Sequence, residues 1–226
     1  MQQNLKDTAQ ALLEAQHIAI ISHKNPDGDT LGSQLALGRA LQQTGKDVVL
    51  YNRDKVAEKF YFIAGANTVM QYTDGMALPE TVVFVDCAEP QLAGFQLTDA
   101  VLDGKTIINI DHHASNKRYG TYNYVVSTAG ANCQNIYHVL QEMQLPVTAD
   151  IATALYVGLS TDTGNFMYAC EDAWELLPKF LPYITDVHLK DRGLEDNGGN
   201  PCMALDGTPL YPVPVGSGVI PIEKIM

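Results

Sequence analysis

The chain has 226 residues, of which 46% are hydrophobic and 18% are charged, and its formal net charge is −12. This length allows one large α/β domain, or one domain and a smaller piece, and the composition is that of a soluble globular protein. The excess of acidic residues disfavours binding to long duplex nucleic acid, which depends on Lys and Arg. No apolar run reaches the roughly 18 to 20 residues needed to cross a bilayer. We therefore expect neither a membrane nor a long nucleic acid as a partner.

Residues 1–16 have the spacing of an amphipathic helix and lack the basic start and continuous apolar core of an export signal. The four cysteines, Cys87, Cys133, Cys170 and Cys202, include no C-x-x-C pair, which argues against a zinc knuckle and against a disulfide framework. Both features favour reduced thiols and a cytoplasmic location.

Apolar, β-branched runs then alternate with helical patterns. The expected strands cover 17–22, 46–52, 81–86, 105–113 and a tyrosine-rich segment around 119–124. The expected helices cover 30–45, 129–143 and 150–164, with a short one at 58–65. Continuously apolar strands are typical of parallel sheets that are covered on both faces. Up to Tyr168 the pattern predicts an α/β fold, with a doubly wound, mainly parallel sheet and helices on both faces.

The pattern changes after Tyr168, and we predict a first domain over 1–168 and an appended helix-strand-loop tail over 169–226. In this tail, residues 172–184 suggest a helix interrupted by its prolines, and residues 185–191 suggest a strand. Residues 192–218 are rich in Gly and Pro and show no periodicity.

Metal-competent side chains follow three of the predicted strands and end one predicted helix. In chain order they are His23, Asp27, Asp29, Asp86, Asp111, His112, His113 and Asp162. Because parallel strands end at a common edge, we expect these side chains to converge, where unpaired carboxylates would repel one another. The mixed oxygen and imidazole set suits Mn²⁺, with Mg²⁺, Co²⁺ or Zn²⁺ as alternatives. Two ions about 4 Å apart would activate a water and clamp a phosphoryl group.

Single motifs also have simpler interpretations. PDGD, at 26–29, is typical of a turn. Asp27 and Asp29 suggest the start of a calcium loop, but Leu31 and Gly32 do not suit its later positions. Surface or packing roles are expected for two further histidines, His17 and His138.

In their order and spacing, HKNPDGD, VDC, DHHASN and STDTGNF resemble the four motifs of the DHH phosphoesterase superfamily. From residue 1 to about 168 the chain is most similar to the subgroup of bifunctional oligoribonucleases and phosphatases of adenosine 3′,5′-bisphosphate (PAP). The resemblance implies a metal-dependent hydrolase for phosphodiester or phosphomonoester bonds in short oligoribonucleotides or nucleotide bisphosphates. The oligomeric state is not indicated.

The resemblance also implies a role for each residue. One metal ion would be held by His23 and Asp27, and Asp86 would bridge the two ions. The second ion would be held by Asp29, His112 and Asp162.

Three further residues would act around the metals. His113 would face the substrate and either hydrogen-bond its phosphate or protonate the leaving oxygen, while Asp111 would orient an imidazole. Ser33, near the start of the following helix, would contact the substrate anion.

The later part of the sequence departs from this subgroup, whose members carry a second domain with a glycine-rich segment and a histidine that grips the nucleotide. We expect no such domain in these 226 residues, and DNGGN, at 196–200, is expected to be only a turn. A metal-binding scaffold with weak or no turnover is therefore an alternative. Residues from about 172 to 226 instead resemble, through DVHLKDR and PVPVGSGVIPIEKI, a fragment of xylose-isomerase-like sugar-phosphate isomerase and epimerase barrels. Such an isomerase is a second alternative, and a chimera joined near 169–172 would explain both resemblances.

Overall fold

The structure, a computed structural model, describes residues 2–96, 99–167, 171–183, 191–199, 202–203 and 208–213. The chain divides into a first unit, Met1–Tyr183, and a second unit, Ile184–Met226. The boundary predicted from the sequence, after residue 168, falls inside the first unit.

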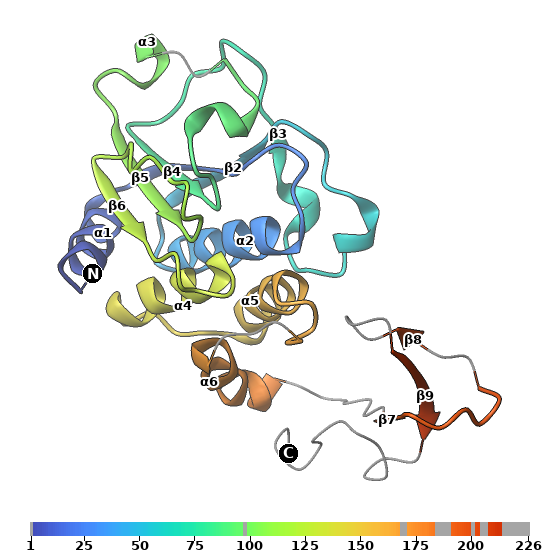
Figure 1. The fold of residues 1–226 in the computed structure, drawn as a ribbon. Coiled ribbons are helices and arrows are strands. Elements are labelled where there is room, and N and C mark those ends of the chain that lie inside the picture. Colours follow the sequence, from blue (N-terminus) through green and yellow to red (C-terminus); the bar gives the residue numbers. More distant parts are fainter. Residues whose placement is uncertain are drawn as a thin grey trace. The chain divides into compact units, whose positions relative to one another are not determined.

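Six parallel strands form one sheet in the first unit (Figure 1). In chain order they are β1 (His17–Ile21), β2 (Asp47–Asn52), β3 (Met70–Gln71), β4 (Thr81–Val85), β5 (Thr106–Asp111) and β6 (Tyr122–Val125). Their spatial order is β3-β2-β1-β4-β5-β6, the doubly wound order in which the chain turns back across the centre between β3 and β4. In register, Ile20 pairs with Leu50 on one side and with Val83 on the other. The predicted α/β fold is confirmed.

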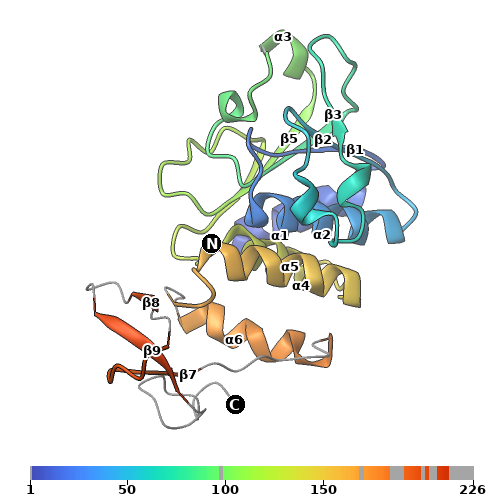
Figure 2. The same ribbon diagram turned by 90° about the vertical axis from the view of Figure 1, so that its right-hand side faces the viewer.

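Helices cover the sheet and form further layers on one side of it. The α-helices are α1 (Gln2–Glu14), α2 (Gly28–Gln43), α3 (Asp99–Leu102), α4 (Asn132–Glu142), α5 (Ala149–Asp162) and α6 (Glu171–Phe180). The 3₁₀ helices are η1 (Glu58–Phe60), η2 (Ala66–Thr68), η3 (Pro90–Ala93) and η4 (Leu181–Tyr183). Figure 2 shows α2 close to the sheet, with α5 and then α6 farther away. Of the helix predicted at 58–65 only the turn η1 forms, and β3 was not predicted. No helix among the described residues is long and apolar enough to cross a membrane.

The two faces of the sheet pack into different cores. Along β1, Ile18 and Ile20 join a cluster that contains the long helices, whereas Ala19 and Ile21 join a second cluster rich in aromatic rings. The short elements η3 and α3 contribute to this second cluster. These four side chains are each at most 1% exposed. Burial on both faces explains why these strands are continuously apolar in sequence.

Helix α6 extends the first unit beyond the predicted domain. Its Trp174 ring lies 5.3 Å from that of Phe166, and Leu176 and Phe180 are buried in the cluster of long helices. The helix continues through Pro178, where the sequence suggested an interruption. Because its apolar face packs on α5, α6 is part of the first core rather than the start of the tail.

The second unit contains a small antiparallel sheet of order β7-β9-β8. Its strands are β7 (Asp191–Gly193), β8 (Cys202–Met203) and β9 (Pro209–Val213), which the sequence did not predict. Within DNGGN, the N–H groups of Gly198 and Gly199 donate to the side chains of Asp196 and Asn197, as in the expected turn. Most of the strand predicted at 185–191, and most of PVPVGSGVIPIEKI, lie outside the described residues.

Candidate metal centre

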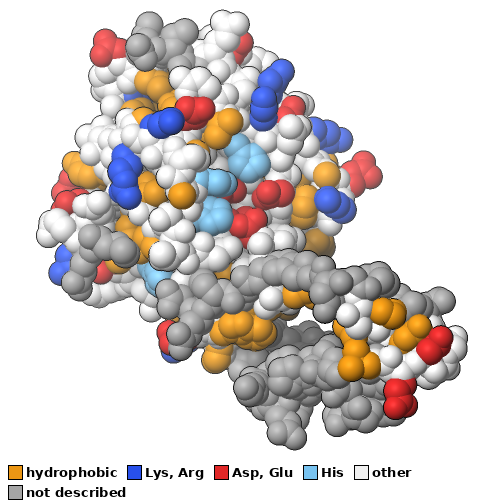
Figure 3. Space-filling view, viewed as in Figure 1, with side chains coloured by type: hydrophobic (Ala, Val, Ile, Leu, Met, Phe, Trp, Pro, Cys, Tyr) orange, Lys and Arg blue, Asp and Glu red, His pale blue; other side chains and the backbone are white. Residues whose placement is uncertain are grey.

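The predicted metal-competent residues lie at one edge of the sheet. Strands β1, β4 and β5 are parallel neighbours, so the loops that follow them leave the sheet at the same edge. Figure 3 shows His side chains grouped with acidic side chains on one face of the molecule, and Lys and Arg side chains on both sides of them. The topology thus gathers residues that are far apart in sequence.

Asp27 shapes the loop after β1 because it is the N-cap of α2. Its Oδ1 accepts hydrogen bonds from the backbone N–H groups of Asp29 and Thr30, each at 3.0 Å. The turn interpretation of PDGD and the site interpretation are therefore compatible, since the capped turn delivers Asp29 and Thr30 to the first turn of α2. Both residues are buried there.

Asp86 directly follows β4 and has a φ of +52°. This left-handed conformation is uncommon for a residue other than glycine, and such strain is often found at functional sites. The Asp86 N–H donates to the carbonyl of Ile110 at 3.0 Å, which continues the hydrogen-bond ladder towards β5. The sheet therefore holds Asp86 in this position.

Among the described residues, three groups have ligand atoms within 4.8 Å of one another. They are His23 with Asp27 and Asp86, Asp29 with His112 and Asp162, and Asp86 with His112 and His113. The first two groups contain the six residues that the sequence nominated as metal ligands. Asp86 links these two groups, because it belongs to the first and shares the third with His112 of the second.

The two carboxylate oxygens of Asp86 face different groups. Oδ2 accepts a hydrogen bond from Thr30 Oγ1 at 2.8 Å and lies 3.4 Å from His23 Nε2. Oδ1 lies 3.5 Å from His112 Nε2 and 3.6 Å from His113 Nδ1. Oδ1 is buried and has no hydrogen-bond partner among the described residues. A buried oxygen without a partner costs stability, so this atom fits a cation that is bound between the groups.

Thr30 was not identified from the sequence. Its fully buried Oγ1 lies 2.6 Å from His23 Nε2 and 2.8 Å from Asp86 Oδ2. A hydroxyl has one proton and can donate to only one of these acceptors at a time. A threonine in a helical turn carries no local signal of such a role, and only the approach of β4 to α2 reveals it.

Backbone carbonyls orient two of the histidine rings. His23 Nδ1 lies 2.6 Å from the carbonyl of Lys24, and His112 Nδ1 lies 3.2 Å from that of Ala129. With Nδ1 as the donor, Nε2 of each ring keeps its lone pair for a ligand, which is the usual arrangement of metal-binding histidines. Each Nε2 is also the ring nitrogen that lies nearest to Asp86.

Asp29 connects α2 to α4. Its Oδ2 accepts from the N–H of Asn132 at 2.5 Å and its Oδ1 from the N–H of Cys133 at 2.9 Å. The N-cap residue of α4, Ala131, makes no side-chain capping hydrogen bond. Asp29, which belongs to α2, therefore caps the N-terminus of α4 instead. Burial and the nearby carboxylates of Asp86 and Asp162 nevertheless raise the pKa of Asp29 well above its usual range.

Asp162 reaches the centre because α5 crosses α2 closely. A Cβ on Gly32 would lie 2.4 Å from the carbonyl oxygen of Ala154, and only glycine permits this approach. The crossing places Asp162 Oδ2 3.5 Å from His112 Nε2. Burial raises the pKa of Asp162, and the charge of His112 partly offsets this effect. Gly32 therefore has a packing role here.

Asp111 holds His113. Asp111 is fully buried, and its Oδ1 lies 2.8 Å from His113 Nδ1 while its Oδ2 accepts from Asn116 Nδ2 at 2.6 Å. The hydrogen bond to Asp111 raises the pKa of His113 to about 9, against the effect of partial burial. The His113 side chain is 44% exposed, so its edge is open to a bound molecule. Asn116 lies in the DHHASN motif, but its role was not predicted.

Ser33 is placed differently from the other predicted residues. It is fully buried, and its Oγ accepts from Asn132 Nδ2 at 3.1 Å and lies 3.5 Å from Cys133 Sγ. This position in the interior disfavours the direct contact with substrate that the sequence suggested.

The histidines and carboxylates of the centre shift one another's pKa values. Burial by itself lowers the pKa of His23, but the hydrogen bond and charge of Asp86 raise it to about 9. Burial conversely favours the neutral form of Asp86, yet His23, His112 and Thr30 together lower its pKa below the ordinary value. Without a metal, the imidazoles therefore supply positive charge to the buried acids.

The family of the chain follows from its sequence match. A profile described as "DHH family, N-terminal domain" matches residues 17–159. The chain belongs to the DHH family. The matched segment contains every residue of the centre except Asp162, which lies just beyond it.

Relatives of this DHH chain include phosphatases and nucleases. It is 36% identical over 155 residues to the bifunctional oligoribonuclease and PAP phosphatase NrnA of Thermus thermophilus, covering 67% of this chain and 45% of that one. It is 27% identical over 186 residues to a probable manganese-dependent inorganic pyrophosphatase of an Exiguobacterium species, covering 79% and 58%. The chain thus spans about half the length of the curated relatives it matches.

A solved structure shows the same fold. An exopolyphosphatase-related protein from Bacteroides fragilis superposes with a TM-score of 0.75 at 20% identity, covering 82% of this chain and 58% of that one. These comparisons give no support to the expected kinship of the tail with an isomerase barrel, nor to a chimeric origin.

Proposed function

We propose that this DHH chain is a metal-dependent phosphoesterase that hydrolyses phosphodiester or phosphomonoester bonds with two divalent cations. The observation that carries the proposal is the carboxylate of Asp86, which is buried and turns one oxygen towards each of two His and Asp groups. A carboxylate shared in this way suits a pair of ions, as in two-metal phosphoesterases.

The residues present fit such ions. The buried Oδ1 of Asp86 lacks a partner among the described residues, and the donors are carboxylate oxygens and imidazole nitrogens. In this proposal His23, Asp27 and Asp86 would hold one ion, and Asp86 would be shared with the second. The second ion's other ligands would be Asp29, His112 and Asp162. This donor set suits Mn²⁺, and Mg²⁺, Co²⁺ or Zn²⁺ are alternatives. When bound, the cations supply positive charge against the phosphoryl group and lower the pKa of a water.

His113 is the proton donor in this proposal. Its Nδ1 is held by Asp111, so Nε2 is the nitrogen left for the substrate. In the metal-free protein Asp111 raises the pKa of His113 to about 9, which favours the protonated imidazole. A protonated Nε2 can donate to a phosphate oxygen or to the leaving oxygen. Asp111 and Asn116 would keep the ring oriented without touching the substrate.

Short oligoribonucleotides or nucleotide bisphosphates such as PAP are the proposed substrates. The name of the Thermus thermophilus relative supports this class, and the net charge of −12 argues against long duplex nucleic acid. The cytoplasmic location inferred from the cysteines stays a prediction.

Hydrolysis in the presence of Mn²⁺ tests the proposal. The full chain should release nucleotide from a short oligoribonucleotide, or phosphate from PAP, and a chelator should abolish this release. In Asp86→Asn we expect at least about a thousandfold loss of rate, because a ligand shared by both ions contributes several kcal/mol. Asp47→Asn, at the far end of β2, is the matched control and should retain the rate.

Two outcomes would contradict the phosphoesterase proposal. Hydrolysis that persists in Asp86→Asn would place the chemistry elsewhere. Tight binding of two Mn²⁺ without turnover of either substrate would favour the metal-binding scaffold.

A further inference from the structure

We propose that Lys24 and Arg53 form a subsite for a second phosphate group of the substrate, beside the metal centre. This inference rests on the proposed function, because it concerns the substrate of that same site. Lys24 directly follows His23, and Arg53 directly follows β2, the neighbour of β1. Both residues are exposed and stand at the edge of the sheet from which the metal-competent loops leave.

The backbone fixes Lys24 relative to the metal centre. Its N–H donates to the carbonyl of Leu92 at 2.8 Å, and its own carbonyl lies 2.6 Å from His23 Nδ1. On the neighbouring strand, the carbonyl of Arg53 accepts from Gln71 Nε2 at 3.0 Å. Both basic side chains therefore start from anchored positions, one of them adjacent in sequence to a candidate ligand.

Gly94 makes room for these two side chains to lie together. It ends η3 with a φ of +77°, and a Cβ built on it would lie 2.7 Å from Arg53 Cδ. The same Cβ would lie 3.2 Å from both Arg53 Nη1 and Lys24 Cβ. The Arg53 side chain thus crosses the Gly94 backbone next to Lys24, where a larger residue would displace it.

No ion pair of Lys24 or Arg53 is found in the part of the chain that the structure describes. The carboxylate of Asp54, adjacent to Arg53, is turned to the backbone, where it accepts from the N–H of Asn25 at 2.8 Å. An exposed Lys and an exposed Arg on neighbouring loops attract an anion between them. In a chain with a net charge of −12, an unpaired Lys and Arg form a local site for an anion.

The ligand chemistry follows from the position of the pair. Arg presents a planar fork that matches phosphate oxygens, and Lys adds a mobile point charge. Lys24 adjoins His23 in sequence, and its carbonyl holds the His23 ring, so we expect a phosphate bound by Lys24 to belong to the same small substrate as the one being cleaved. The subsite therefore favours substrates with two phosphate groups over those with one.

Kinetics of the full chain with Mn²⁺ test the subsite. PAP carries two phosphates and adenosine 3′-monophosphate carries one, with the same base and sugar. In Lys24→Gln and in Arg53→Gln we expect KM for PAP to rise about tenfold, the usual effect of losing one charge-assisted hydrogen bond. The KM for the monophosphate, and kcat for both substrates, should stay within about twofold of the parent values.

The control variant is Lys6→Gln, which removes an exposed cation on α1. It should change KM for PAP by less than about twofold, because charges that are far apart in solvent are screened. An equal rise of KM for both substrates in the subsite variants, or an unchanged KM for PAP, would overturn the subsite.

Failure of the proposed function can be told apart from failure of the subsite. If neither substrate is hydrolysed, the phosphoesterase proposal fails, and calorimetric binding of PAP and of the monophosphate to the Mn²⁺-loaded chain decides about the subsite. Lys24→Gln and Arg53→Gln should then raise Kd for PAP about tenfold and leave that of the monophosphate unchanged. A Kd for PAP that equals that of the parent chain would contradict the inference.

Discussion

A His and an Asp meet at both ends of the parallel sheet, in very different surroundings. At the carboxyl end, His23 Nε2 lies 3.4 Å from Asp86 Oδ2, and their side chains are 23% and 3% exposed. At the amino end, His17 Nδ1 lies 3.2 Å from Asp47 Oδ2, and the exposures are 61% and 72%. The residue types and distances are similar, but the extent of contact with water is not.

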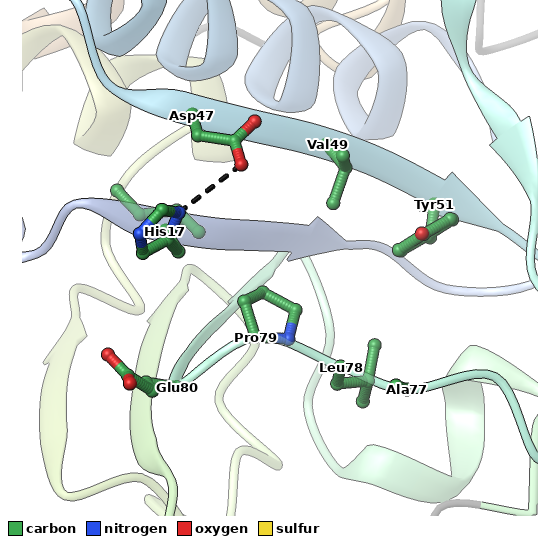
Figure 4. A pocket seen from close by; sticks show the side chains of 9 residues that line it. His17, Asp47, Val49, Tyr51, Ala77, Leu78, Pro79 and Glu80 are labelled. Atoms are coloured by element: carbon green, nitrogen blue, oxygen red, sulfur yellow. Dashed lines mark hydrogen bonds and ion pairs between the residues drawn. The ribbon is translucent and has the colours of Figure 1, made fainter.

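A pocket of about 380 Å³ lies beside the exposed pair. Its lining includes His17, Asp47 and Glu80 beside apolar side chains (Figure 4). None of the metal-competent groups among the described residues includes any of these three. The comparison teaches that a His and Asp pair at a strand end forms a site only where several elements bury further ligands beside it. Water screens the exposed pair, whereas burial strengthens the interactions of the other.

The largest expected difference between the two ends is the response to metal. Mn²⁺ at about one hundred times its Kd should stabilise the fold by about 2.7 kcal/mol per site, and hence raise the thermal midpoint by several degrees. Asp86→Asn should abolish this shift, whereas Asp47→Asn should preserve it. Differential scanning calorimetry with and without Mn²⁺ measures both. A similar loss of the shift in both variants would erase the distinction between the ends.

The pH should change the metal affinity of the carboxyl end, because protons bound there compete with the metal. The pKa of His23 is raised from 6.5 to about 9 because Asp86 outweighs the effect of burial. A metal must displace this proton, so the apparent affinity should fall as pH decreases below about 9, by about tenfold per unit for each proton released. For the metal-free protein, the stabilisation from protonated His23 is complete below pH 6.5 and is lost as pH rises through about 9. Calorimetric titrations in buffers of different ionisation enthalpy count the protons, and binding without proton release would contradict this assignment.

A smaller effect on Mn²⁺ affinity is expected from substitution of Thr30, whose hydroxyl contacts only the buried His and Asp pair. Thr30→Val keeps the shape but removes the hydroxyl that lies between His23 and Asp86, so we expect Mn²⁺ affinity to fall about tenfold. Thr30→Ser keeps the hydroxyl and should restore most of the affinity. Electron paramagnetic resonance should also show weaker coupling between two Mn²⁺ ions in Thr30→Val, because Asp86 would be less well oriented. Identical titrations and spectra for the parent and the valine variant would exclude a positioning role.

The smallest effect is expected at the amino end. An exposed ion pair contributes little, so His17→Gln should change the free energy of unfolding by less than about 0.5 kcal/mol. Urea denaturation with and without Mn²⁺ should show the same small change in both conditions. A loss above about 1 kcal/mol would show that exposure does not separate the two pairs as we suggest.

Much of the carboxyl end was predictable from local sequence. The apolar runs around Ile20 and Val83 indicate buried parallel strands, and the acids and imidazoles that follow them are visible without a structure. Because parallel strands end at a common edge, their convergence could be inferred as well. The capping role of Asp27 also follows from its motif.

Other features depend on contacts between distant segments and could not be predicted. Thr30 and Asn116 take part only because β4 and β5 bring Asp86 and Asp111 to them. The interior position of Ser33 follows from the approach of α4 to α2, which its neighbours in sequence do not reveal. The extension of the first unit through α6 likewise depends on packing against α5.

The sequence by itself determined the strand pattern, the parallel sheet and the set of metal-competent residues, because hydrophobic periodicity and the residues at strand ends are local properties. Only the tertiary structure decided which His and Asp are buried together, which oxygen of Asp86 faces which group, and which hydroxyl and amide orient them. The physical reason is that burial and hydrogen bonding at the centre arise from loops and helices that are adjacent in space but far apart along the chain.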